Sequence, residues 1–483
     1  MVFFHGVRAS EVPTSIVAPV QTTAGLPVVF GTAPVHLTED PTAYVNKPVI
    51  CYSYAEAVAA LGYSADWENY SLCEVIYSQF KLYAVAPIIF VNVLDPSKHK
   101  KNVSDTTGRA VTDGVLVVTD DVMLASLKVK TAEAATPAVL DTDYTAEFDD
   151  DGQTVITIIN GGALDGAAEL YLEYTAIDAS LVDSEDIIGG VDRDGNNTGM
   201  ELLNEIYPRF AMVPGIVAAP GWSQIPGVAA VMKVKALAIN NLFRCIVLTD
   251  VDTEVVTKYT DVNAWKNKNS YTGVNQLVLW PMVQLGDYIF HYSTQMLGII
   301  GKTDANNQDV PYQSPSNISM QATGMCLKDG TEVFLGLEQA NLLNSQGVIT
   351  GLNFIGGWKS WGNYTGAYPG MTDVKDTFIC VRRMFDWQYQ TFILTYWQKV
   401  DQPLMPRLVR TILDSEQIRL NGLVSRGYLL GASVDFLEDE NPLTDLLNGI
   451  LRIHTKLTPP VPAQTIEDIL EYDVNNFEAL FNA

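Results

Sequence analysis

Short runs of almost wholly apolar residues recur along much of the chain, and segments with helical periodicity lie between them. The strand-like runs are PVVFGTAP (27–34), PIIFVNVL (87–94), RCIVLTD (244–250) and QLVLWP (276–281). The helix-like segments are residues 54–61, 72–82 and 226–243. Strands that are apolar on both faces and alternate with helices are typical of a largely parallel sheet with helices on both sides. This alternation predicts an α/β fold.

Between residues 104 and 183 the pattern changes to strands alone. DYTAEF and QTVITII lie on either side of the turn signal Asp151-Gly152, which predicts a β-hairpin. Three consecutive aspartates, residues 149–151, would form the charged tip of this hairpin. A small all-β, sandwich-like domain inserted into the α/β domain fits this pattern best.

From about residue 376 the chain becomes helical. Six apolar residues recur at steps of three and four and predict a helix of about 25 residues. They are Phe378, Val381, Phe385, Tyr389, Phe392 and Tyr396. We expect this stripe to face a core, because such stripes are far more often core than cofactor site. These helices predict an α+β C-terminal domain that carries an extended arm.

Both ends of the chain are predicted to be arms. Near the N-terminus Pro13 and Pro19 interrupt any helix. Near the C-terminus Leu451, Ile453 and Leu457 alternate with charged residues as in a one-faced strand, and a proline-rich hinge follows. The predicted divisions are 1–22 (extended arm), 23–103 and 184–370 (α/β domain), 104–183 (inserted β domain), 371–450 (C-terminal domain) and 451–483 (strand-donating arm).

Charge and composition exclude several classes of protein. The net charge of −26 argues against a wide basic surface for nucleic acid. The five cysteines are scattered and odd in number, which predicts neither a disulfide framework nor a zinc site. The start of the chain does not look like a signal peptide, and the longest apolar stretch is too short to span a membrane. The acidity favours either solubility alone or self-repulsion that restrains premature assembly.

Motifs that carry catalysis or bind cofactors are incomplete. No G-x-S-x-G sequence surrounds any serine. Gly301-Lys302-Thr303 resembles the end of a phosphate loop, but Met296 stands where the first glycine is required. The spacing around Asp192 fails for a calcium loop. We therefore predict no catalytic residue, no cofactor and no metal, and a protein that is not an enzyme.

Seven segments, in order along the whole chain, resemble a known family. They are MVFFHGVRASEV (1–12), PVICYSYAEAVAALG (48–62), SPSN (314–317), ANLLNSQGVIT (340–350), WGNYT (361–365), GYLLGASVDFLEDENP (427–442) and TPPVPAQTIEDILEYD (458–473). The family is that of contractile tail sheath proteins, including R-type pyocin and Mu/P2-like phage sheaths. The family usually has WGNRT, so the contacts of that arginine do not transfer to Tyr364.

The resemblance implies a structural subunit that polymerises around an inner tube as stacked hexameric rings in a six-start helix. It implies an α/β domain with a subtilisin-like layout but no activity, an inserted domain facing outward and a C-terminal domain facing the tube. Contraction would drive the tube through a target cell envelope. The implied partners are neighbouring sheath subunits, the inner tube, baseplate and tail terminator proteins, with no nucleic acid and no direct membrane insertion.

The implied location is a virion tail or phage-like particle assembled in the cytoplasm of a bacterial host. Two alternatives belong to other classes of protein. One is a tail tube, capsid or surface-layer structural protein, and the less favoured one is a subtilisin-like hydrolase. An image of assembled material would separate a sheath from a tube or flat sheet.

Two sets of residues are predicted to make contacts with partners. The first set would add strands to neighbouring subunits, since a foreign strand satisfies the unpaired groups of a sheet edge. It comprises Val12, Ile16, Val17, Leu451, Ile453 and Leu457. The second set is basic and would face the tube, and it comprises Arg407, Arg410, Arg419 and Arg426. Between residues 380 and 430 seven basic residues stand against four acidic ones. Alternatively, several of these arginines pair within the fold or between rings.

Overall fold

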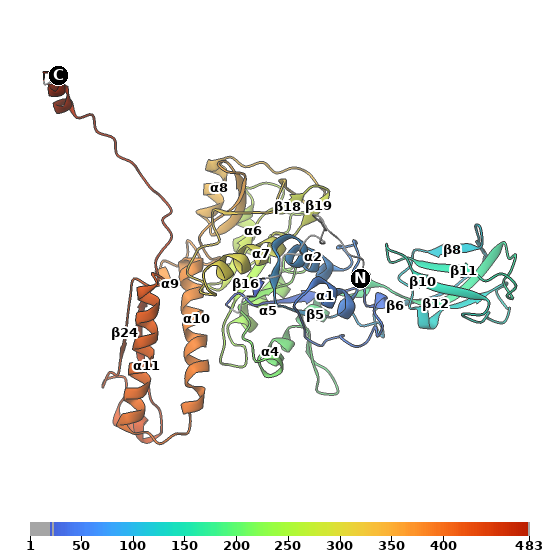
Figure 1. Cartoon of the computed structure of the whole chain (residues 1–483), viewed down its shortest axis with the longest axis horizontal. Helices are drawn as coiled ribbons and strands as arrows, with labels where there is room; N and C mark the ends of the chain where they lie inside the picture. The colour runs from blue at the N-terminus through green and yellow to red at the C-terminus, as the bar shows by residue number, and fades with distance from the viewer. Residues whose placement is uncertain (1–19, 22–23, 482–483) are drawn as a thin grey trace, which may run out of the picture.

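A computed structural model describes residues 20–21 and 24–481, with side chains from 24 to 477. Figure 1 shows a central α/β body, a strand-rich domain projecting from one end and two long helices at the other. A C-terminal tail runs away from the top of these helices. The predicted contact residues Val12, Ile16 and Val17 lie outside the described residues.

The body is built on a nine-stranded mixed sheet. Its strand order is β20 (Ile318–Ser319), β23 (Trp358–Trp361), β22 (Val348–Asn353), β17 (Gln276–Leu279), β16 (Ile246–Asp250), β15 (Ile216–Ala218), β2 (Pro27–Gly31), β5 (Ile88–Asn92) and β3 (Val49–Cys51). The strands from β22 to β5 are parallel, and those beyond them are antiparallel. Every residue of β2, β5, β16 and β17 is buried, as their apolar sequences predict.

Helices pack against this sheet. Those of the body are α1 (Tyr54–Leu61), α2 (Ser71–Tyr77), α3 (Ser184–Ile188), α4 (Leu203–Phe210), α5 (Pro226–Ala236), α6 (Val262–Lys268), α7 (Tyr292–Asn306) and α8 (Leu337–Asn344). Ser53 caps α1 by accepting a hydrogen bond from the backbone N–H of Glu56, and Pro226 opens α5. Gly301 and its two neighbours lie inside α7.

The body also contains three smaller sheets of two or three strands among its described residues. β1 (Val20–Gln21) pairs in parallel with β4 (Val85–Ala86), and β18 (Met282–Leu285) pairs with β19 (Tyr288–Phe290) and β21 (Gly324–Cys326). β13 (Gly190–Val191) and β14 (Asn197–Thr198) form a hairpin whose turn holds Asp192. That carboxylate accepts hydrogen bonds from backbone N–H groups of its own turn, at 2.9 and 2.8 Å.

The strand-rich domain has two sheets and a core of its own. One sheet is β10 (Tyr144–Phe148), β11 (Thr154–Ile158) and β8 (Val115–Val118). The other pairs β12 (Glu169–Ile177) with β6 (Lys100–Ser104), β7 (Arg109–Ala110) and β9 (Lys128–Lys130). Tyr144 stands opposite Ile158 and Phe148 opposite Thr154, which confirms the predicted hairpin. Buried side chains such as Leu116 and Leu172 form a cluster separate from the body's core.

The acidic turn of that hairpin lies at the body end of the strand-rich domain, not at its far end. A Cβ on Gly152 would lie 3.3 Å from a methyl group of Leu37. The ring of Phe148 meets His36 edge-on at 5.8 Å, and the Nε2 atom of His36 lies 3.4 Å from Asp121. The hairpin tip is therefore part of a joint between the two domains, and burial in this joint lowers the pKa of His36 to about 4.

The C-terminal domain contains α9 (Val374–Thr377), α10 (Ile379–Tyr396), α11 (Pro406–Ser425), α12 (Leu443–Leu447), β24 (Gly431–Asp435) and β25 (His454–Thr458). The predicted long helix is α10, with 18 residues. Its aromatic stripe does not face the core as expected, because Tyr389 is 40% exposed and Phe385 is only partly buried. The buried face instead carries Arg383 and Gln388, whose polar groups have partners on α7 and α11.

Beyond Thr458 the chain is extended until the short helix Val474–Phe481. We call residues 459–481 the C-terminal tail. Between residues 466 and 473 its apolar side chains are largely exposed, with Ile466 90% and Leu470 88% exposed. No helix in the described part of the chain is both long and apolar enough to cross a bilayer.

Candidate functional site

The WGNYT motif joins segments that are far apart in the sequence. The indole N–H of Trp361 donates to the side-chain oxygen of Asn341 at 3.0 Å. The backbone N–H of Gly362 donates to the hydroxyl of Ser316, also at 3.0 Å. Asn341 belongs to the segment ANLLNSQG, and Ser316 belongs to SPSN. Three of the segments that carry the family resemblance therefore meet at one place.

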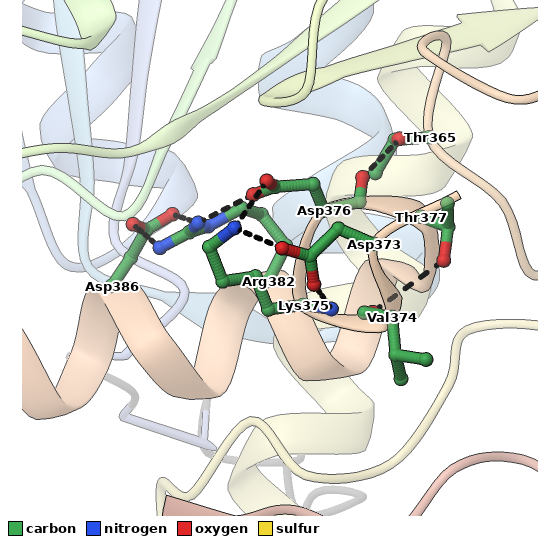
Figure 2. Close-up of polar contacts among 8 residues, drawn as sticks. All are labelled: Thr365, Asp373, Val374, Lys375, Asp376, Thr377, Arg382 and Asp386. Atoms are coloured by element: carbon green, nitrogen blue, oxygen red, sulfur yellow. Dashed lines mark hydrogen bonds and ion pairs between the residues drawn. The ribbon is translucent and has the colours of Figure 1, made fainter. Parts of the chain in front are cut away.

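The second half of the motif fixes the start of the C-terminal domain (Figure 2). Thr365 is fully buried, and its hydroxyl donates to the backbone oxygen of Asp376 at 2.7 Å. Its backbone N–H donates to the oxygen of Thr377 at 2.8 Å. The N–H of Ile379, the first residue of α10, donates to the oxygen of Asn363 at 3.0 Å. These bonds hold the beginning of α10 against the body.

A cluster of charges surrounds this junction (Figure 2). Arg382 lies 2.8 Å from Asp376 and 2.8 Å from Asp386, one turn along α10. Lys375 bridges Asp376 at 2.8 Å and Asp373 at 2.5 Å. Burial by itself would lower the pKa of Arg382, but the two carboxylates beside it raise that pKa above its ordinary value. Each of the three carboxylates therefore pairs with Arg382 or Lys375.

Tyr364 links the motif to the C-terminal tail. Its ring stacks on Tyr368 with centroids 3.8 Å apart and planes 6° from parallel. The ring of Phe378 also packs against the ring of Tyr364, with centroids 5.0 Å apart. The hydroxyl of Tyr364 donates to the side-chain oxygen of Gln464 at 2.7 Å. The residue that departs from the usual family motif therefore contacts the tail, which no local sequence signal predicted, because the partners are a hundred positions apart.

The first residues of the tail cross an open groove of about 610 Å³ beside this stack. Its lining is made of hydroxyl, amide and aromatic side chains together with residues 460–465 of the tail. Pro460 and Pro462 restrict the backbone in this stretch. We call this region the arm junction. Contacts with the body therefore set the direction in which the tail leaves the subunit.

The strand predicted to be donated to a neighbour pairs within its own chain. β25 runs antiparallel to β24, from Gly431 opposite Thr458 to Asp435 opposite His454. Leu457 packs against the small core under α11, while Leu451 and Ile453 are partly buried just before the strand. The pairing within the chain differs from the expected donation to a neighbour. β24 follows α11 directly and is separated from β25 by a short stretch of chain, so the two strands can pair at little cost in loop entropy. Among the described strands, β24 and β25 each pair on one side only, which leaves two open edges.

The four predicted tube-facing arginines have different environments. Arg419 lies 2.6 Å from Glu416, which is fully buried, so this arginine pairs within the fold. Burial by itself would raise the pKa of Glu416, but Arg419 and Gln388 hold it below its ordinary value. Arg426 donates to the backbone oxygen of Gly422 at 3.1 Å and lies over the ring of Tyr428.

Arg407 and Arg410 are exposed on the first turns of α11. They adjoin an apolar surface at the connection between α10 and α11 that the sequence reasoning did not single out. Its residues are 41 to 61% exposed and are Leu394, Trp397, Val400, Leu404 and Met405. We call these five residues and the two arginines the helical tip. In the sequence these apolar residues are interrupted by Gln398, Lys399, Asp401 and Gln402, so no apolar pattern marked them.

No arrangement for hydrolysis or metal binding was found among the described residues. His291 lies 2.7 Å from Glu74, and Ser293 bonds instead to Asp250. In the described part of the chain no serine hydroxyl bonds to a histidine ring, and no group of three or more His, Cys, Asp or Glu side chains is placed to hold a metal ion.

Comparison with known proteins identifies similar sequences, although no family model matches the chain. The chain is 25% identical to the tail sheath protein of Burkholderia phage BcepMu, over 96% of its own length and 95% of that protein. It is 27% identical to the major tail sheath protein of Serratia phage KSP20 over 63% of its length and 75% of that protein. The tail sheath protein of Escherichia phage P2 is 25% identical over 58% of the chain and 68% of its own length.

Solved structures share the fold. The helical sheath of the anti-feeding prophage in its contracted state matches with a TM-score of 0.56 at 14% identity, covering 98% of this chain and 100% of that one. The contracted sheath complex of an extracellular contractile injection system, PVC, matches at 0.57 and 12% identity over 99% of both chains. The resemblance to tail sheath proteins is thus confirmed over nearly the whole chain.

Proposed function

We infer that this protein is the sheath subunit of a contractile tail, a structural protein and not an enzyme. The observation that carries this conclusion is the similarity to a phage tail sheath protein over 96% of the chain. The mixed α/β fold, which matches contracted sheaths of injection systems over its whole length, supports it. The protein is a component of a virion tail or of a phage-like particle.

The finer features of the assembly are also part of the proposal. Subunits form hexameric rings that stack as a six-start helix around an inner tube, and baseplate and tail terminator proteins close the two ends. Assembly takes place in the cytoplasm of a bacterial host. The parallel centre of the sheet, with helices packed on it, supports a subtilisin-like layout for the body. Contraction drives the tube through the envelope of a target cell.

The arms link the subunits into a mesh. We assign the donated strand to the exposed residues 466–473 of the C-terminal tail, since β25 is already paired within its own chain. The open edges of the β24–β25 sheet are the acceptors for such strands, and residues 1–22 supply the second arm. In this proposal Leu451, Ile453 and Leu457 belong to the acceptor side of the contact.

The energy of one such link is small. Burying Ile466, Ile469 and Leu470 stabilises by roughly 1.5–3 kcal/mol each as an upper bound. Ordering about eight residues costs ~1–2 kcal/mol per residue. A single arm is therefore marginal, whereas arms in a closed lattice bind with a high effective concentration. The chain then stays dissociated below a critical concentration, and a ring or baseplate lowers the concentration that it needs.

The helical tip is the proposed contact with the inner tube. Arg407 and Arg410 are exposed, and an acidic tube surface would pair with them. Ion pairs between exposed charges contribute little binding free energy, and salt weakens them further. Such pairs suit a contact between sheath and tube that must break when the sheath contracts. Arg419 is withdrawn from the tube-facing set because it neutralises the buried Glu416.

Removal of residues 459–483 tests the proposed function. We expect a folded subunit that forms no sheath, because these residues make few contacts with their own chain. A matched control keeps the length and replaces residues 466–473 by a Gly-Ser repeat, which retains the arm junction but removes the donated strand. Negative-stain images of the full chain should show wide, ridged sheaths. Narrow tubes, shells or flat sheets would contradict the assignment, and long sheaths from the truncated chain would contradict the role of the tail.

A further inference from the structure

The turn between β22 and β23 carries the most exposed pair of neighbouring large apolar residues in the described part of the body. Phe354 is 62% exposed and Ile355 is 78% exposed. Asn353 pairs with Trp358 to close the turn, and Gly356 and Gly357 supply its left-handed positions with φ of 77° and 85°. Turns of this kind favour polar residues and glycine, so the backbone has no need of Phe354 and Ile355. Their exposure requires another explanation.

A hollow of about 410 Å³ adjoins these two side chains. Leu337 at the start of α8, the buried Leu352 and the ring of Trp361 form its apolar walls. Trp361 also lines the groove of the arm junction, so the two hollows adjoin each other. Phe354 and Ile355 thus project beside an apolar hollow. Exposed large side chains next to such hollows are typical of the centres of protein interfaces.

The charge around this surface is the reverse of the charge of the chain. Lys359 is the one charged residue among the described residues that line the hollow. The next groove along shares Lys359 and adds the exposed Lys302, and no carboxylate is among its described lining residues. The whole chain, in contrast, has 56 acidic and 30 basic residues. The complementary partner is therefore apolar and acidic.

A second copy of this chain presents that chemistry. Leu443 and Leu447 on α12 are 71% and 78% exposed. They follow the acidic residues Glu438 and Asp439, which are also exposed. We propose that the β22–β23 turn of one subunit docks on such an acidic and apolar surface of a neighbouring copy. This inference rests on the proposed function, which supplies the homopolymer.

The contact would be heterologous, because the two surfaces that meet are different. Heterologous contacts generate rings or open helical arrays instead of closed dimers. The proposed interface is thus an addition to the arms. It joins folded bodies directly, with apolar burial as its main source of affinity and the lysines as its steering charges.

Site-specific labelling tests the proposal. All five native cysteines are buried, and burial raises the pKa of the thiols of Cys51 and Cys73 to about 12, so a new exposed cysteine is the reactive one. The variant Ile355→Cys should react with a maleimide in dissociated subunits. In assembled polymer the rate should fall by about tenfold or more. The control is Val191→Cys on β13, where the native side chain is 65% exposed. Its labelling rate in subunits and polymer measures how far polymerisation alone hinders the maleimide.

Three other results would overturn the inference. Equal labelling of residue 355 in subunits and polymer shows that no copy covers the turn. Protection that appears only after tube protein is added shows that the tube is the occupant. A wild-type chain that forms no polymer overturns the proposed function and removes the partner that this inference requires, and it is recognised before any labelling.

A second measurement keeps the test independent of cysteine chemistry. The double variant Phe354→Ser, Ile355→Ser should raise the critical concentration for polymerisation by about tenfold, while the melting temperature of dissociated subunits stays the same. The double variant Val191→Ser, Val234→Ser removes two other apolar side chains, which are 65% and 63% exposed, and should leave the critical concentration unchanged. An unchanged critical concentration in the turn variant would contradict the proposal.

Discussion

The α/β body and the C-terminal helical domain differ in the size of their apolar cores and in how many polar side chains their main elements bury. In the body, whole strands such as β2 and β15 are apolar and buried, and one large cluster forms the core. In the helical domain the core is small, α10 buries Arg383 and Gln388, and Trp397 and Met405 are left exposed. The comparison teaches that the core of the body is completed within one chain. The helical domain leaves large apolar side chains exposed at its tip, where we propose the contact with the tube.

Matched truncations give the sharpest test of this comparison. Phe90→Ala in β5 removes a fully buried ring from the core and should lower the free energy of unfolding by about 4 kcal/mol. Trp397→Ala removes a larger ring that is 58% exposed and should change it by less than about 0.5 kcal/mol. Urea unfolding of dissociated subunits measures both. Equal losses would place the helical tip in a core and break the comparison.

The buried ion pair between α10 and α7 should give the next largest effect. Arg383 contacts Asp304, and their side chains are 4% and 1% exposed. Arg383→Met leaves the carboxylate of Asp304 buried without its partner and should cost about 3 kcal/mol. Adding Asp304→Leu should restore most of that stability. Lys328→Met, which breaks an exposed pair with Glu254, is the control and should cost under about 1 kcal/mol.

Acid should weaken the joint between the strand-rich domain and the body. Burial keeps His36 neutral in the folded protein, with its pKa lowered to about 4, whereas the unfolded chain takes up the proton below about 6.5. Stability is therefore fully present above pH 6.5 and falls as the pH drops towards 4, by about 2–3 kcal/mol. Unfolding curves at pH 7 and pH 4 measure this loss. His36→Phe should show a smaller pH dependence, and an equal dependence would contradict the assignment.

The smallest effect on stability is expected at the helical tip. Arg407→Glu with Arg410→Glu should change the free energy of unfolding by less than about 0.5 kcal/mol, because both side chains are exposed. The same variant should reduce co-sedimentation with inner tube while sheath-only polymers still form. Arg419→Met is the contrasting variant and should destabilise the subunit, since Glu416 is fully buried. Unchanged tube binding across a salt series would remove these arginines from the tube contact.

The sequence predicted those parts of the fold that depend on neighbouring residues. The helix expected at residues 54–61 coincides with α1, because Ser53 caps it and its apolar spacing is local. The alternation at residues 450–457 indicated a strand, but it could not say which edge that strand would meet. Pairing with β24 depends on where α11 ends, and that is set by tertiary packing.

The candidate site was only partly predictable. The motif segments were identified, but their meeting point depends on bonds across long stretches of chain, such as Tyr364 with Gln464. The aromatic residues spaced three and four apart in α10 indicated that they share one face of the helix. The spacing did not show what packs on that face. Residues such as Arg383 look like surface charges in a sequence, and they become core residues only because Asp304 lies opposite.

The two ends of the strand-rich domain are neighbours in space. The chain enters through β6 and leaves through β12, and Lys100 stands opposite Ile177 in that pair. Adjacent entry and exit points place almost no demand on the length or shape of what connects them. We therefore expect a replacement domain to be accepted at these paired strands if it also preserves the joint with His36 of the body. For an engineer, the same paired strands are a splice point at which a foreign domain could be displayed on the particle.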